Sequence, residues 1–265
     1  MKKKKRGKFL VILILLMLVF HSISGNIDYS ILFNLQALEI IFAGIVLTSI
    51  IGYTYDTLVL TTKMVAKSFK YHVDYEGSIY KMYTYAVKIK KHGVLKVQKD
   101  IQVEDHEFVQ KSLELVSDMT KAKDVDDILT KDIIARKTHL TKAYNVLKTI
   151  SQTAPAFGLI GTLIGMIGLL SHMENSVLLI NNMSSALVST LYGALVSNFI
   201  AIPLMGRVRE MIDHQILEYQ IIKAGAVQMS QNDTVRNVFN KMNAMLPLEK
   251  RLAYPQNQKN EGGRG

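Results

Sequence analysis

Thr162 and Thr190 lie inside the apolar segments of the C-terminal half of the chain, where side chains capable of chemistry are scarce. Thr162 lies in the segment 153–171 and Thr190 in the segment 184–206, and neither segment contains Asp, Glu, Lys, Arg or His. Na⁺ is a hard cation that needs several oxygen ligands in place of its water, and hydroxyl groups can supply them. Each hydroxyl could also bond to a carbonyl oxygen of its own helix. The sequence therefore leaves an ion-pathway role and a helix-stabilising role open for both threonines.

The absence of ionisable side chains from these two segments limits what the chain can do alone. A protein that relays protons usually places an ionisable group inside the membrane. We therefore expect another chain to supply that group, and this chain to line one wall of a pathway. The sequence also shows no metal-ligand cluster and no nucleophile–base pair near the segments, so we expect no catalytic residue, no metal site, no enzymatic activity and no cofactor other than a transported ion.

Four glycines in the same segments predict close packing of helices. Gly158, Gly161 and Gly165 recur at three- and four-residue spacing, and Gly193 lies on a face of small residues in the second segment. Glycines at this spacing let two helix backbones approach closely. We interpret these glycines as packing residues rather than ligands.

Two prolines mark the cytoplasmic ends of the apolar segments. Pro155 lies at the entry of the first segment and Pro203 near the exit of the second. Because proline removes a helix donor and kinks or ends a helix, both could simply be boundaries. They could also be hinges that couple the membrane helices to the cytoplasmic helices.

The apolar segments must be carried by membrane helices. Apolar blocks cover residues 9–24, 37–60, 153–171 and 184–205, and the last three reach the roughly 20 residues that a bilayer core requires. The charged residues follow a pattern: Lys and Arg precede the first block, fill 63–148 and resume at Arg207. Because Lys and Arg accumulate on the cytoplasmic side, both termini and the central segment are predicted to be cytoplasmic. The net charge of +10 is thus a topology signal, and no base-reading motif suggests a nucleic-acid partner.

The N-terminal apolar block has a second interpretation. A basic start, an apolar run from Phe9 to Phe20 and the small residues Ser22 and Ser24 before Gly25 are also typical of a cleaved signal peptide. We favour a retained helix, which gives an all-α protein with four spans and a cytoplasmic helical domain inserted between spans two and three.

The predicted organisation follows from these blocks. Apolar residues at helical spacing predict a long amphipathic helix that runs into span three, with Val125, Ile128, Leu129, Ile133, Ile134 and Leu140 on its apolar stripe. A second helix is expected around 108–119, and Gly93 is expected at or near a helix cap. The predicted parts are a basic N-terminus (1–8), spans one and two (9–60), the cytoplasmic helical domain (61–152), spans three and four (153–206), a cytoplasmic helix (207–253) and a disordered tail (254–265).

The two apolar segments resemble a known family. The run Ala154–Gly165 (APAFGLIGTLIG) is similar to the third-span signature of flagellar stator A subunits, the MotA/PomA branch of the MotA/TolQ/ExbB proton channel family. The run Ala186–Ala194 (ALVSTLYGA), followed by Asn198 and Pro203, is similar to the fourth-span signature. The order of two spans, cytoplasmic domain, two spans and tail also matches, so the resemblance covers most of the chain.

The resemblance implies a function in motility and chemotaxis. In that family five A subunits surround two B-subunit helices, whose aspartate binds the ion, and ion flow drives a rotor. This chain is accordingly expected in the bacterial inner membrane as a homopentamer in contact with lipid, with a MotB/PomB-like B subunit and a FliG-like rotor protein as partners. Lys90 and Lys91, in a turn (KKHGVL) similar to the family's rotor-contacting turn, become candidate rotor contacts, although they could equally form a solvated helix end. Gln98 departs from the glutamate usual there.

The resemblance leaves the transported ion and one sister group open. Threonines at the places of Thr162 and Thr190 accompany sodium-driven stators, so Na⁺ is favoured over H⁺. Proton-coupled sister proteins also keep threonines in these spans. A TolQ/ExbB-like proton-driven energy transducer is the alternative function, and a cleaved N-terminus would favour it.

Overall fold

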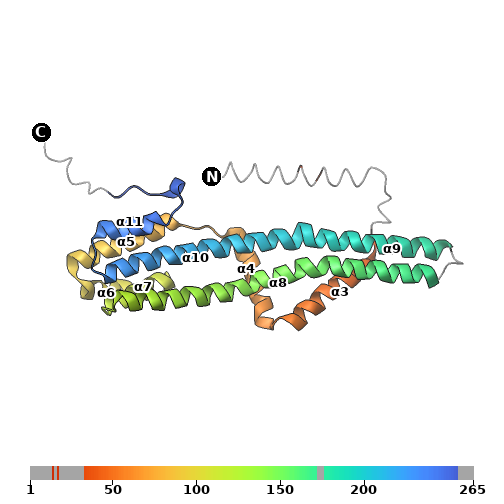
Figure 1. Cartoon of the computed structure of the whole chain (residues 1–265), viewed down its shortest axis with the longest axis horizontal. Helices are drawn as coiled ribbons and strands as arrows, with labels where there is room; N and C mark the ends of the chain where they lie inside the picture. Colours follow the sequence, from red (N-terminus) through yellow and green to blue (C-terminus); the bar gives the residue numbers. More distant parts are fainter. Residues whose placement is uncertain (1–13, 15–16, 18–32, 172–175, 256–265) are drawn as a thin grey trace. The chain divides into compact units, whose positions relative to one another are not determined.

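The computed structural model describes residues 33–171 and 176–255, together with Ile14 and Met17 (Figure 1). The described residues form helices and no strand, which confirms the predicted all-α class. The helices in chain order are α3 (Leu35–Gly52), α4 (Tyr55–Lys70), α5 (Tyr75–His92), α6 (Val94–Gln102), α7 (Glu107–Ser117), α8 (Ala122–Ser171), α9 (Ser176–Leu195), the π-helix η1 (Val196–Ala201), α10 (Ile202–Ser230), α11 (Val235–Ala244) and the 3₁₀ turn η2 (Leu248–Lys250).

The chain divides into two compact units. The apolar unit comprises Met1–Leu58 and Val146–Met205, and the polar unit comprises Val59–Asn145 and Gly206–Gly265. Three helices are long and apolar enough to cross a membrane: Leu35–Gly52, Ala122–Ser171 and Asn182–Ser230. The second and third of these helices contain predicted spans three and four. Predicted span two covers residues 37–60, but its helix, α3, ends at Gly52, and residues 55–60 belong to α4. The predicted first span and the predicted tail from 256 onward lie outside the described residues, so the count of four spans stays a prediction.

The apolar unit is built around the C-terminal half of α8, with α3 and α9 packed on it. Helix α3 begins where Asn34 caps it: the Asn34 side chain accepts a hydrogen bond of 2.9 Å from the Ala37 backbone N–H. The ring of Phe157 on α8 lies against Gly44 of α3 so closely that a Cβ at Gly44 would be 2.3 Å from it. Large apolar side chains on the outside of the unit are exposed, as expected for a surface that faces lipid or other chains.

The polar unit is a helical bundle with an apolar core. Its largest fully buried side chains come from six helices: Ile79 and Met82 (α5), Ile101 (α6), Phe108, Val109 and Leu113 (α7), Val125 and Leu129 (α8), Ile221 and Ile222 (α10), and Phe239 and Met242 (α11). Helix α5 ends at Gly93, which adopts the left-handed φ of 77° that favours glycine. The structure therefore confirms the predicted cap at Gly93 and the predicted helix near 108–119.

Two predictions about the polar unit need correction. The predicted stripe of α8 is narrower than expected: Val125, Leu129 and Ile133 are buried, whereas Ile128 and Ile134 are 38% and 58% exposed. Ile134 follows Val125 by nine residues, which at about 100° per residue is about two and a half turns of helix. The two side chains therefore lie on opposite faces of α8.

The segment 207–253 is not one helix. It contains the rest of α10, then α11 and η2, and the break occurs where Asn232 takes a left-handed φ of 57°. Thr234 then caps α11, because its side chain accepts a hydrogen bond of 3.2 Å from the Asn237 backbone N–H. Asn just after the end of one helix and Thr just before the start of the next are ordinary sequence signals of such a break.

Candidate ion pathway

The structure brings the hydroxyl groups of Thr162 and Thr190 into direct contact within the apolar unit. Thr162 lies on α8 and Thr190 on α9, and their Oγ1 atoms are hydrogen-bonded to each other. The Oγ1 of Thr162 is also 3.1 Å from the carbonyl oxygen of Gly158 and 3.1 Å from that of Ala186. Two hydroxyl and two carbonyl oxygens from two helices therefore converge, which we call the threonine cluster.

The chemistry of the threonine cluster suits a cation better than an anion. Hydroxyl and carbonyl oxygens all carry lone pairs, and the two hydroxyls have only one proton each to donate. Such oxygens are ligands that hard cations prefer. Thr190 is exposed at the surface of the unit, so the cluster is accessible from outside the chain. A cation at this place would still need a negative charge, and neither span contributes one.

Close contact between α8 and α9 is what allows the threonines to meet. A Cβ at Gly158 would lie 2.9 Å from the Ser189 carbonyl oxygen, and one at Gly161 would lie 2.6 Å from the Ser189 Cβ. A Cβ at Gly165 would lie 2.6 Å from the Ala186 Cβ, and one at Gly193 would lie 2.6 Å from the Ala154 carbonyl oxygen. At these four positions any larger residue would push the helices apart.

Two hydrogen bonds fix the register around the cluster. The Ser197 hydroxyl donates to the Ser151 carbonyl at 2.7 Å, which joins η1 to α8. The hydroxyl of Tyr53, the residue that follows the C-terminus of α3, is 2.6 Å from the hydroxyl of Thr149 on α8. These contacts join helices that are distant in sequence, so residue patterns alone could not identify them.

The two prolines lie inside helices rather than at helix boundaries. Pro155 is within α8, which continues through it. Pro203 is the second residue of α10 and directly follows the π-helix η1, where the Ile202 N–H bonds to the Ser197 carbonyl. Proline offers no N–H and its ring conflicts with the carbonyl of residue i−4, here Phe199, so a local π-helix relieves the conflict. Sequence analysis did not predict η1, although Pro203 was its signal.

The candidate rotor residues Lys90 and Lys91 end α5 in different surroundings. The Lys90 ammonium donates to the backbone carbonyl of Asn232 at 2.8 Å and to its side-chain oxygen at 2.7 Å. Lys90 therefore holds the left-handed turn between α10 and α11. Lys91 is exposed.

Glu39 is an ionisable residue of the apolar unit that the sequence analysis did not single out. It lies one turn into α3, and its side chain is exposed. Its position inside predicted span two is the signal that could have identified it, because a charged side chain is rare in an apolar segment. Among the described residues no group of three or more His, Asp or Glu side chains is placed to hold a metal ion.

The polar unit contains a charged cluster that joins α7 to α8. The Arg136 guanidinium lies 2.5 Å from Glu107 and 3.1 Å from Asp132, and it also lies over the ring of Phe108. Hydrogen bonding to Glu107 raises the pKa of Arg136, and the same bond lowers the pKa of Glu107. The cluster therefore ties α7 to α8.

Comparison with known proteins agrees with this architecture. Residues 100–221 match the MotA/TolQ/ExbB proton channel family. The chain is 29% identical over 205 residues to chemotaxis protein PomA of Vibrio alginolyticus, covering 76% of this chain and 80% of that protein. It is 27% identical over 210 residues to motility protein A of Treponema pallidum, covering 77% and 80%.

Two solved structures share the fold. The C. jejuni MotAB structure matches with a TM-score of 0.82 at 15% identity, over 92% of this chain and 96% of that chain. The flagellar MotAB stator complex from Bacillus subtilis matches with a TM-score of 0.80 at 22% identity, over 91% and 95%. Residues 100–221 thus match a MotA/TolQ/ExbB proton channel family domain, and the resemblance to MotA and PomA proteins inferred from the sequence is confirmed.

Proposed function

We propose that this chain is the A subunit of a flagellar stator in the bacterial inner membrane, and that with a B-type subunit it couples cation flow to rotation. The observation that carries the proposal is the threonine cluster on two apolar helices that lack ionisable residues. A partner carboxylate beside these oxygens would complete a cation site. The similarity to motility protein A and PomA sequences supports the same function.

We further propose that the coupling ion is Na⁺ and that the chain acts as a pentamer around the partner helices. Protonation of a partner carboxylate needs only one basic oxygen, whereas Na⁺ needs several oxygen ligands. The cluster offers four oxygens in one place, which favours Na⁺.

The test compares Thr162→Ala with Thr162→Ser in cells that swim with this protein and its genomic B-subunit neighbour. Swimming speed should depend on external Na⁺, and Thr162→Ala and Thr190→Ala should each abolish it while the complex still assembles. Thr162→Ser keeps the hydroxyl and should retain speed. Thr153→Ala is the matched control, because Thr153 lies on the same helix and bonds to the Thr149 carbonyl of its own helix.

Two results would contradict the proposal at different levels. Full speed in sodium-free medium that collapses with a protonophore would establish H⁺ as the coupling ion. Robust cation flux through liposomes that contain only this purified chain would contradict the requirement for a partner carboxylate.

A further inference from the structure

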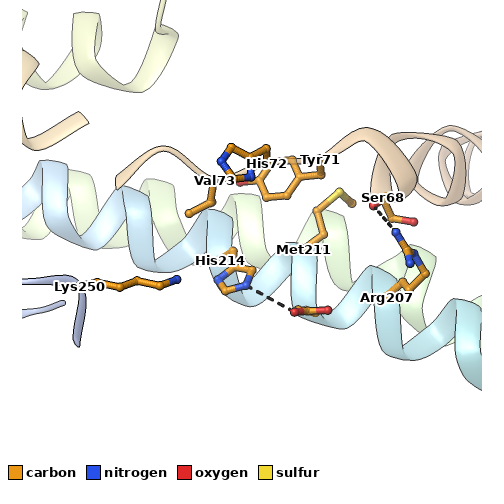
Figure 2. Close-up of a pocket in the computed structure, with 9 residues that line it drawn as sticks. Ser68, Tyr71, His72, Val73, Arg207, Met211, His214 and Lys250 are labelled. Atoms are coloured by element: carbon orange, nitrogen blue, oxygen red, sulfur yellow. Dashed lines mark hydrogen bonds and ion pairs between the residues drawn. The ribbon is translucent and has the colours of Figure 1, made fainter. Parts of the chain in front are cut away.

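The polar unit contains a cavity whose lining is rich in cationic and hydrogen-bond-donating side chains. Its volume is about 270 Å³. Figure 2 shows the residues that line it, which come from the end of α4, the link to α5, helix α10 and η2: Ser68, Tyr71, His72, Val73, Arg207, Glu210, Met211, His214 and Lys250. In this view Arg207 and Lys250 lie at opposite ends with His214 between them (Figure 2). We call it the Arg207 cavity.

Arg207 is held in place by two contacts of its guanidinium group. The group donates to the Ser68 carbonyl at 3.2 Å and lies 4.4 Å from the centroid of the Phe69 ring. A guanidinium has five N–H donors, and the Ser68 carbonyl accepts from only one nitrogen of Arg207. The planar arrangement of the guanidinium donors suits a phosphate. Because the side chain is positioned before any ligand arrives, less conformational entropy is lost on binding.

The centre of the cavity offers further donors whose orientation is fixed. The Tyr75 hydroxyl is 2.7 Å from Nδ1 of His214. Burial, and then the charge of Glu218, raises the pKa of Tyr75, so its phenol stays protonated and can donate to Nδ1. When Tyr75 donates to Nδ1, the other ring nitrogen, Nε2, carries a proton and can act as a donor. Burial also raises the pKa of Tyr71, whose hydroxyl likewise remains a donor.

Acidic side chains limit where an anion could lie. Nε2 of His214 is 3.8 Å from the carboxylate of Glu210. A neighbouring hollow that shares His72, Val73 and Lys250 is lined by Asp74, Glu76 and Glu249. Negative charge on that side weakens the attraction of an anion to Lys250, so Arg207 is the stronger of the two cationic contacts of the cavity.

The position of Arg207 in the chain indicates where such an anion would come from. Arg207 is the first charged residue after the apolar segment 184–206, and the two belong to one continuous helix. A cationic pocket directly beyond a membrane helix lies at the depth of lipid headgroups. The apolar side chains of Val73 and Met211 also line the cavity.

We propose that the Arg207 cavity binds the phosphate of an anionic phospholipid headgroup from the cytoplasmic leaflet, with Arg207 as the principal contact and His214, Tyr71 and Lys250 as further donors. The bound lipid would hold the start of the cytoplasmic part of α10 against the link between α4 and α5, because the cavity is lined by both. This site is independent of the transported ion.

The test uses the full chain purified in non-ionic detergent, followed by native mass spectrometry during titration with short-chain phosphatidylglycerol, the matching phosphatidylcholine, or inorganic phosphate. Phosphatidylglycerol should bind at least about fivefold more tightly than phosphatidylcholine, and Arg207→Gln should weaken its binding by about fivefold, the effect of one cation near a headgroup. Lys250→Gln should weaken the binding measurably but less, because acidic side chains line the hollow beside Lys250. Arg209→Gln is the matched control: it removes the same charge two residues along α10, from an exposed side chain that does not line the cavity.

Three results would overturn the proposal. An equal loss in Arg209→Gln would reduce the effect to general surface charge. Equal affinity for the two lipids would remove the anionic selectivity. Inorganic phosphate that binds as tightly as phosphatidylglycerol would identify a site for a soluble anion instead. If Arg207→Gln disturbs folding through its contacts with Ser68 and Phe69, Lys250→Gln decides, because it lies in the separate turn η2.

Discussion

At the scale of single residues, Glu104 shows how the polar unit stabilises a carboxylate that is largely shielded from solvent. Its side chain is 7% exposed, accepts a 2.6 Å hydrogen bond from Lys81 and a 3.1 Å bond from the Tyr85 hydroxyl, and also accepts one from the His106 backbone. Burial alone would raise the pKa of Glu104, but the hydrogen bonds, led by that of Lys81, outweigh it and lower the pKa. Burial, and then the charge of Glu104, raises the pKa of the neighbouring Tyr85 to about 12.

The sign of this shift gives a prediction for stability against pH. Because the folded pKa of Glu104 is below its usual value of 4.5, the ionised side chain stabilises the fold above that pH, and the contribution is lost as pH falls through the folded pKa. Glu104→Gln should lower the free energy of unfolding at pH 7 by about 1–3 kcal/mol. Thermal unfolding followed by circular dichroism at pH 7 and pH 3 measures it.

The control for Glu104 is an exposed carboxylate on α7. Glu114→Gln should leave the melting temperature nearly unchanged at both pH values, because the Glu114 side chain is exposed. If Glu104→Gln destabilises the protein equally at pH 7 and pH 3, the ionised form is not what stabilises the fold.

Lys90 and Lys91 give a second prediction at this scale. Because Lys90 holds the Asn232 turn, Lys90→Gln should lower the melting temperature by about 2–4 °C. Lys91→Glu should leave the melting temperature unchanged but reduce swimming, if its charge steers docking to an acidic rotor surface. Tethered-cell rotation measures torque. Normal torque in Lys91→Glu would place the rotor contact elsewhere.

At the scale of helices, the contact between α8 and α9 depends on glycines that have no room for a side chain. A Cβ at Gly165 would lie 2.6 Å from the Ala186 Cβ and 2.9 Å from the Asn182 carbonyl oxygen. Both neighbours belong to the core of the contact, so the helices themselves would have to move. That movement would also separate Thr162 from Thr190, since the threonine cluster lies on the same contact.

Two glycine substitutions should therefore have opposite effects. Gly165→Ala should destabilise the purified protein by about 1–3 kcal/mol, the usual cost of overpacking. Gly206→Ala should be neutral or stabilising by up to about 1 kcal/mol, because nothing lies within 4 Å of its added Cβ and alanine favours the helix. Thermal unfolding in detergent compares them. Equal stability of both variants would show that α8 and α9 can separate without cost.

At the scale of the whole molecule, the distribution of Lys and Arg predicts how the chain crosses the membrane. Both termini and residues 61–152 should be cytoplasmic. The segments 25–36 and 172–183, which contain no Lys or Arg and include the starts of α3 and α9, should lie on the extracytoplasmic side. Reporter fusions after Gly25 and in the C-terminal tail would measure this. A mature protein whose N-terminal sequence begins near Gly25 would contradict four retained spans and favour the TolQ/ExbB-like alternative.

The sequence by itself determined the features that depend on neighbouring residues. Hydropathy identified the apolar helices, and the left-handed backbone at Gly93 could be expected from a glycine after a basic helix end. Helix α8 continues without a break from its polar half into its apolar half, as the helical pattern of the sequence predicted. These features are local, because backbone hydrogen bonds and propensities act within a few residues.

Only the tertiary structure decided which residues meet. The threonines are 28 residues apart in the chain, and Lys90 and its partner Asn232 are 142 apart, so no spacing rule connects them. The face of α8 that carries Ile134 is likewise exposed because the helices of the core pack on the opposite side. Arg207, the Ser68 carbonyl and Lys250 line one cavity because helix packing, which minimises empty volume among all the side chains at once, brings distant segments together.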